Sequence, residues 1–189
     1  MTRIVALSGS LRRDSYNTWL ARAASQLVPD GVVVEVVTPH GIPLYDGDLE
    51  AEHGIPESVL SLKQRIVAAD GLILFTPEYN NGVPGVLKNT LDWLSRADRV
   101  AVFGNRPVAI AGATPGGWGT VLAQTAWLPT LKVLGTVTYT GKGMMLSKAN
   151  TAFDATGQLI DSSASALLGE FMRGFVGFIE TLNNGAEKQ

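Results

Sequence analysis

The stretch that decides the fold class is RIVALSGSLRRDSYN, residues 3–17. It opens with Arg3 to Leu7, a short and mostly apolar run with β-branched residues, which is typical of a strand. Ser8-Gly9-Ser10 follows as a cluster of turn residues, and from Asn17 to Val28 the apolar residues take helical spacing. A strand that runs through a small polar loop into a helix is typical of α/β proteins, so the sequence predicts an α/β fold.

Short apolar strands and helices keep alternating along the rest of the chain. Because the strand at 71–75 has no polar side chain, both of its faces should be buried, which favours a parallel sheet with helices on both faces. Right-handed crossovers leave few topologies, and we expect a doubly wound sheet of five parallel strands in the order 2-1-3-4-5. The other strands are expected at 32–37, 108–111 and 136–139. Further helices are expected at about 56–70, 84–96, 119–134 and 162–182.

Length and composition limit the classes of protein to which the chain can belong. With 189 residues, 46% of them hydrophobic and 17% charged, it fits one globular domain spanning residues 1–189. A formal net charge of −2 argues against a protein built to capture nucleic acid, and against a strongly acidic electron carrier.

The absence of Cys and the presence of only two His residues exclude several kinds of site. Disulfides, thiolate nucleophiles, Cys-bound zinc or iron–sulfur clusters and multi-His metal sites all need residues that this chain lacks, so we assign no metal ligand. No apolar run resembles a signal peptide or a membrane span of roughly 20 residues. We therefore expect a soluble, cytoplasmic protein with no membrane partner.

In doubly wound sheets, ligands bind beyond the carboxyl ends of the strands where the strand order reverses, and this selects the loops after strands 1, 3 and 4. The first loop combines small residues with Ser10, Arg12, Ser15 and Asn17 at the start of a helix, which suits a phosphate group. It has neither the Gly-Lys-Ser/Thr of a Walker loop nor a Gly-x-Gly-x-x-Gly fingerprint, so a terminal monophosphate fits better than a pyrophosphate. The alternative is a polar turn in which Ser15 only caps the helix.

The other two loops suit a planar ring. Residues 76–85 place Glu78, Tyr79 and two Asn residues at a strand end, where backbone groups and an aromatic wall can surround a heterocycle. Residues 112–119 hold several glycines beside Trp118, which indicates a close approach of backbone to ligand. The alternatives are a surface loop with a solvated Glu78, and a flexible connector. A monophosphate pocket beside a ring pocket matches flavin mononucleotide (FMN).

These motifs resemble the NADPH-dependent FMN reductases, a flavodoxin-like group that includes quinone, azo-dye and chromate reductases. The resemblance covers about residues 3–182 and is most specific from the Pro-Glu-Tyr-Asn to the Leu-Lys-Asn segment. It rests on Ser8-Gly9-Ser10-x-Arg12-x-x-Ser15-x-Asn17, on Pro77-Glu78-Tyr79-Asn80, and on Pro84-Gly85-x-Leu87-Lys88-Asn89-x-x-Asp92-Trp93.

The resemblance implies roles for individual residues. The FMN phosphate would be held by Ser10, Arg12, Ser15, Tyr16 and Asn17. The isoalloxazine ring would be lined by Pro77, Glu78, Tyr79 and Asn80, and closed on its other side by Thr114, Pro115, Gly116 and Gly117. Two departures from the family pattern, Gly82 for a hydroxyl residue and Leu122 for an arginine, put one flavin contact and one interface or nucleotide contact in doubt.

The function expected from this resemblance is an FMN-dependent NAD(P)H oxidoreductase. NADPH or NADH would pass hydride to the flavin, and a small-molecule oxidant such as a quinone, or free flavin, would then collect the electrons. Because the flavin carries the chemistry, no catalytic side chain is assigned. The alternatives are a non-enzymatic, flavodoxin-type electron carrier and a nucleotide-binding protein without a redox role. The loop from His40 to His53 either walls a substrate entrance or is a plain surface loop.

Family resemblance also implies a homodimer or homotetramer, and we expect its interface on the helix that begins at Pro84. Leu87, Leu91 and Leu94 share a face that should pack on the sheet. Val86 and Trp93 share a second face, where Trp93 is expected to be an interface anchor. The alternative is that Trp93 packs under the loop after Arg96.

Overall fold

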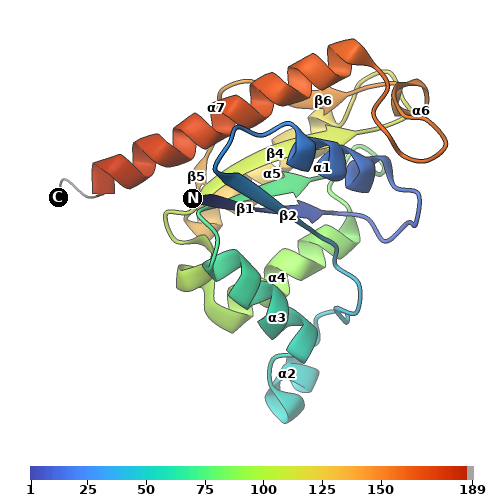
Figure 1. The fold of residues 1–189 in the computed structure, drawn as a ribbon. Helices are drawn as coiled ribbons and strands as arrows, with labels where there is room; N and C mark the ends of the chain where they lie inside the picture. Colours follow the sequence, from blue (N-terminus) through green and yellow to red (C-terminus); the bar gives the residue numbers. More distant parts are fainter. Residues whose placement is uncertain (187–189) are drawn as a thin grey trace.

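The computed structural model describes residues 1–186, and its centre is a parallel sheet with strand order β2-β1-β3-β4-β5, as expected (Figure 1). Each pair of neighbouring strands is parallel, and the register runs, for example, from Thr2↔Val32 to Leu7↔Val37 between β1 and β2. The strands are β1 (Thr2–Ser8), β2 (Val32–Val37), β3 (Gly71–Phe75), β4 (Pro107–Ala113), β5 (Val137–Thr138) and β6 (Met144–Leu146).

The last part of the sheet differs from the prediction of one strand at 136–139. Two short strands replace it: β5 pairs with the first residues of β4, and β6 pairs with the last ones, from Ala111↔Met144 to Ala113↔Leu146. Between them the chain leaves the sheet edge at Tyr139, whose hydroxyl accepts a hydrogen bond from the backbone N–H of Lys142 at 3.0 Å. As a result, β6 brings the residues that follow it to the carboxyl edge of the sheet.

Helices cover both faces of the sheet because side chains alternate along each strand. Ile4 and Ala6 face the core shared with α1 and α7, whereas Val5 and Leu7 face the core shared with α3, α4 and α5. The helices are α1 (Tyr16–Gln26), α2 (Gly47–His53), α3 (Glu57–Val67), α4 (Gly85–Phe103), α5 (Val121–Leu134), α6 (Ala149–Ala152) and α7 (Ser162–Ala186). Among residues 1–186, no helix is both long enough and apolar enough to cross a membrane.

Helix α2 lies in a segment that was expected to be a loop. Asp46 caps it by accepting the N–H of Asp48 at 2.9 Å, and Gly54 ends it with a φ of 75°. None of its residues is buried, so it lacks the apolar periodicity by which a helix is recognised in a sequence.

Helix α4 confirms one prediction and corrects another. Leu87, Leu91 and Leu94 are buried against the sheet as expected. Trp93 was expected on an outer face as an interface anchor, but it is fully buried, and its Nε1 donates to the carbonyl oxygen of Pro43 at 2.9 Å. The cover comes from the segment before α2, and not from the residues after Arg96 that were the stated alternative. A Trp with its N–H paired and its ring buried cannot anchor a second copy.

Candidate functional site

The structure brings the three predicted loops together at the carboxyl edge of β1, β3 and β4. The backbone N–H of Gly9 donates to Phe75 at 2.8 Å, and that of Thr76 donates to Ala111 at 2.8 Å. A side chain on Gly9 would not fit, because a Cβ there would lie 2.7 Å from Leu87 Cδ2. Gly9 therefore lets the first loop pack directly against the start of α4.

The loop after β1 forms a cradle of backbone N–H groups. Ser15 caps α1 by accepting the N–H of Thr18 at 3.4 Å, and Ser10 Oγ accepts the N–H of Arg12 at 3.2 Å. Within the part of the chain that the structure describes, no hydrogen bond uses the N–H groups of Tyr16 and Asn17 in the first turn of α1. These groups and the helix dipole suit an anion.

Arg12 is exposed beside this cradle and takes part in none of the ion pairs among residues 1–186. A free guanidinium next to unpaired N–H groups fits the doubly charged phosphate of FMN, because charge-assisted hydrogen bonds are the stronger ones. The cradle is therefore compatible with FMN on the chemistry of its donors.

Two of the predicted phosphate ligands have other contacts for their side chains. Asn17 Nδ2 donates to the carbonyl oxygen of Ala113, and Asn17 Oδ1 accepts the N–H of Ala113, both at 2.9 Å. The ring of Tyr16 stacks on Phe153 with centroids 6.1 Å apart. Asn17 thus ties the first turn of α1 to the end of β4, and only its backbone N–H is left for a phosphate.

The loop after β3 is a tight hairpin turn. Tyr79 N–H donates to Gly82 at 3.3 Å, and Gly82 N–H donates to Tyr79 at 3.0 Å. Asn80 and Asn81 between them have φ values of 50° and 60°, the left-handed conformation that Asn tolerates and that a two-residue hairpin of type I′ requires. A Cβ on Gly82 would meet only ordinary contacts, so the hydroxyl residue of relatives would fit there.

Glu78 in this loop is engaged in the fold. Its Oε2 accepts the N–H of Ala123 at 2.9 Å, close to the N-terminus of α5, where a carboxylate is favoured by the helix dipole. Pro77 beside it is buried, and Tyr79 is 51% exposed. Glu78 therefore fixes the loop after β3 to the helix that follows the third loop.

The loop after β4 is braced on both sides. A Cβ on Gly112 would lie 2.0 Å from Thr120 Oγ1. On the other side, the N–H groups of Lys148 and Ala149 donate to the carbonyl oxygens of Gly116 and Thr114 at 2.9 Å and 3.0 Å. The flexible connector that was the alternative for this loop does not fit these contacts. Sequence reasoning missed this brace, because its only signal is the three-residue strand Met144–Leu146.

A groove of about 410 Å³ runs between the cradle and the hairpin. It is lined by residues of the first loop, the hairpin and the start of α4: Gly9, Ser10, Leu11, Arg12, Tyr79, Gly85 and Val86. A larger cavity of about 540 Å³ lies between the start of β1, β2 and α3, with Arg3 and Arg65 in its wall, far along β1 from the cradle.

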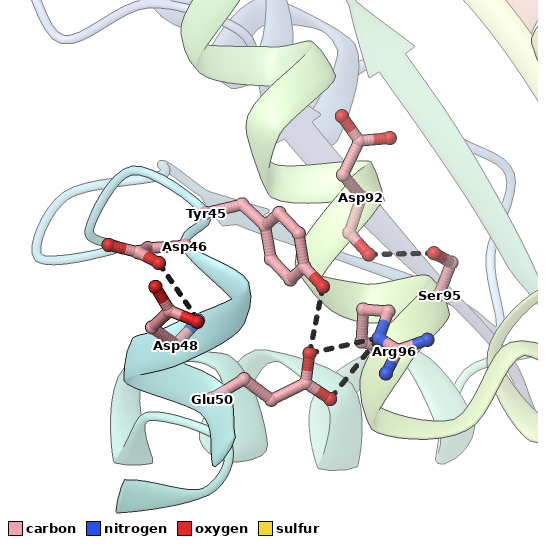
Figure 2. A network of polar contacts seen from close by, with 7 residues as sticks. All are labelled: Tyr45, Asp46, Asp48, Glu50, Asp92, Ser95 and Arg96. Atoms are coloured by element: carbon pink, nitrogen blue, oxygen red, sulfur yellow. Dashed lines mark hydrogen bonds and ion pairs between the residues drawn. The ribbon is translucent and has the colours of Figure 1, made fainter. Parts of the chain in front are cut away.

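A network of polar contacts holds the segment between β2 and α3 against α4 (Figure 2). Tyr45 Oη donates to Glu50 Oε2 at 2.9 Å, and Arg96 Nε donates to the same carboxylate at 2.9 Å. The hydrogen bond from Arg96 lowers the pKa of Glu50, and Glu50 in turn raises the pKa of Tyr45 and of Arg96. This network fixes α2 to the middle of α4.

Comparison with known proteins gives consistent results along most of the chain. Residues 2–151 match the family model for NADPH-dependent FMN reductase. An NAD(P)H-dependent FMN reductase of Pseudomonas aeruginosa is 42% identical over 166 residues, which is 88% of this chain and 89% of that protein. A 2-hydroxy-1,4-benzoquinone reductase of Burkholderia sp. is 37% identical over 177 residues, which is 94% of this chain and 96% of that protein.

A solved structure is similar over nearly the full length. FerB, a flavoenzyme NAD(P)H:acceptor oxidoreductase of Paracoccus denitrificans, superposes with a TM-score of 0.85 at 32% identity. The match covers 96% of this chain and 98% of FerB.

Proposed function

The chain belongs to the NADPH-dependent FMN reductase family and is an FMN-dependent NAD(P)H oxidoreductase, and on that premise we propose that its oxidant is a quinone. When bound, FMN supplies a ring that accepts hydride from a nicotinamide and gives the electrons to an oxidant. In the balanced reaction, NAD(P)H, one proton from solvent and a quinone become NAD(P)⁺ and a hydroquinone. The name of the Burkholderia relative, a benzoquinone reductase, supports this class of oxidant.

The observation that carries the proposal is the meeting of the three loops at one sheet edge. Ser10, Arg12, Ser15 and the first-turn N–H groups of Tyr16 and Asn17 would bind the FMN phosphate. Pro77, Glu78, Tyr79 and Asn80 would line the isoalloxazine ring from the hairpin, and Thr114, Pro115, Gly116 and Gly117 would close the other side. The bonds of Gly9, Thr76 and Asn17 to neighbouring segments hold these loops in place before any ligand binds.

No side chain needs to act as an acid or base in this arrangement. Glu78 already accepts a hydrogen bond from the backbone of α5, so its role is to orient the hairpin. Tyr79 and Trp118, which are exposed at opposite sides of the three-loop cluster, present aromatic faces to a flat oxidant. We place the reaction in the cytoplasm, where reduced nicotinamide nucleotides are supplied.

We also propose a homodimer, with its interface on α5 in place of Trp93. The outer face of α5 is apolar over its whole length and carries one charge, Lys132. Its exposed apolar side chains are Val121, Leu122, Ala126, Leu128, Pro129 and Val133. A helix of 14 residues is about 21 Å long, which is enough for an apolar contact between two copies.

Purified protein tests the function directly. Extracted flavin should run with FMN and not with FAD, and NADPH should be oxidised when a soluble quinone is present. An electron carrier without enzyme activity would bind flavin but would not turn over NADPH, and a protein without flavin would contradict the proposal altogether.

Arg12→Ala tests the placement of the phosphate. The loss of one charge-assisted hydrogen bond, about 1.5–3 kcal/mol, should weaken FMN binding roughly ten- to a hundredfold in a fluorescence titration. Arg13→Ala is the matched control, because Arg13 is the neighbouring exposed arginine and should change the affinity little. Equal affinity of Arg12→Ala and the unsubstituted protein would show that the phosphate lies elsewhere.

A further inference from the structure

Leu44 is 81% exposed, yet the backbone on both sides of it is fixed to α4. Asn89 Nδ2 and Trp93 Nε1 both donate to the carbonyl oxygen of Pro43, at 2.8 Å and 2.9 Å. Asn89 Oδ1 accepts the N–H of Tyr45 at 2.8 Å. One helix therefore holds the residue before Leu44 and the residue after it.

The segment has a second attachment through Tyr45. Its ring packs edge-on against Trp93 with centroids 4.9 Å apart, and its hydroxyl donates to Glu50, which Arg96 also binds (Figure 2). Ordering a loop costs conformational entropy, and an exposed turn that only connected two elements would not need this many contacts. The contacts position Leu44 rather than bury it.

The position of Leu44 places it beside the groove of the candidate site. Gly85 and Val86 of α4 line that groove, and Asn89 lies one turn further along the same helix, about 5.4 Å along its axis. The segment also leaves β2 at the carboxyl edge of the sheet, where Val37 pairs with Leu7. Three exposed apolar side chains from three loops thus surround the groove: Leu11, 49% exposed, Tyr79, 51% exposed, and Leu44.

We propose that Asn89 and Trp93 are positioning residues that hold Leu44 as one wall of the oxidant entrance, and that this wall selects quinones with an alkyl substituent. The inference rests on the proposed function, and it names the class of quinone. The quinone ring would lie toward the flavin loops, and its substituent would contact Leu44 and Leu11. Removal of apolar surface from water then favours the alkylated oxidant, by up to about fourfold per buried methylene.

Kinetics with a series of 1,4-benzoquinones that differ only in alkyl chain length test the proposal. With the FMN-loaded protein, KM should fall as the chain lengthens, while kcat stays constant. Leu44→Ser should flatten this dependence and leave KM for unsubstituted benzoquinone unchanged. Val100→Ser, which changes a 72% exposed apolar residue elsewhere on α4, is the matched control and should retain the dependence.

Asn89→Ala tests the positioning role separately. The variant should flatten the chain-length dependence as Leu44→Ser does, and chymotrypsin should cleave after Leu44 and Tyr45 faster than in the unsubstituted protein. Trp93→Phe keeps the aromatic ring and loses only the bond to Pro43, so it should give an intermediate slope. Faster cleavage of Asn89→Ala with an unchanged slope would overturn the proposal.

Binding of the same quinones to the oxidised, FMN-loaded protein gives a second readout without turnover. Quenching of flavin fluorescence should show the same gain in affinity with chain length, and the same loss in Leu44→Ser. If the protein binds alkylquinones with this slope but does not oxidise NADPH, the proposed function fails and the entrance stands. If affinity does not depend on chain length, the entrance proposal is wrong whatever the activity.

Discussion

Helices α4 and α5 both begin directly after a loop of the candidate site, and they differ in what lies over their outer faces. On α4, Trp93 points away from the sheet but is buried, because the segment around Pro43 and Tyr45 covers it. On α5, Trp127 and Leu131 are buried, whereas Leu122 and Val133 on the opposite face are exposed. Within residues 1–186 no segment covers this second face.

The difference shows what apolar periodicity reports. It identifies which residues share a helix face, since side chains three or four positions apart lie together. It does not report what packs on that face. The cover of Trp93 comes from a residue 50 positions earlier in the chain, and the outer face of α5 has an apolar stripe with no such partner.

Trp93→Ala has the largest expected effect and would break the comparison if it were small. It removes a fully buried ring and the hydrogen bond to Pro43, and should lower the free energy of unfolding by about 3–5 kcal/mol. Trp118→Ala is the matched control: Trp118 is 86% exposed, and its loss should change stability by about 0.5 kcal/mol or less. Chemical denaturation measures both, and similar midpoints for the two variants would contradict the burial of Trp93.

Glu78→Ala should have an intermediate effect, on α5. The carboxylate accepts the Ala123 N–H near the helix N-terminus, so its loss should cost about 1 kcal/mol and loosen the hairpin of the flavin site. Glu78→Gln keeps an acceptor and loses only the charge, and should cost less. Denaturation midpoints of the two variants check this order, which a general-base role for Glu78 does not predict.

Much of this site follows from the sequence. The strand order and the three loops at the carboxyl edge come from local patterns of apolar residues, Gly and Pro, and the structure confirms that architecture. Three features depend on contacts between distant residues, which local patterns do not encode. They are the burial of Trp93 under Pro43, the pairing of the Asn17 side chain with Ala113, and the brace of the third loop by Lys148.

Acidification should weaken the cover of α4 by a smaller amount. The Arg96 and Tyr45 hydrogen bonds lower the folded-state pKa of Glu50, so its contribution to stability is present above the unfolded-state pKa of about 4.3. The contribution is lost as the pH falls through the lower, folded-state value. Glu50→Gln should therefore melt at a lower temperature than the unsubstituted protein at pH 7, and the difference should close by about pH 3.

Glu52→Gln is the control for this experiment. Glu52 is on the same helix, and its only ion pair among residues 1–186 is with the neighbouring His53 at 3.7 Å. Its melting temperature should follow that of the unsubstituted protein at both pH values. A constant difference between Glu50→Gln and the unsubstituted protein from pH 7 to pH 3 would show that charge on Glu50 does not hold the cover.

Leu122→Glu should have the smallest effect on folding and the clearest effect on assembly. Leu122 is exposed on the outer face of α5, so its substitution should change the free energy of unfolding by about 0.5 kcal/mol or less. If two copies pair α5 against α5 about a two-fold axis, the same patch lies on both sides, and each new carboxylate meets apolar surface or its own copy. Light scattering should then report a dimer for the unsubstituted protein and a monomer for Leu122→Glu. Val100→Glu introduces the same charge on the exposed end of α4 and should remain a dimer. A monomeric unsubstituted protein, or equal masses for all three, would mean that the apolar face of α5 has some other role than pairing two copies.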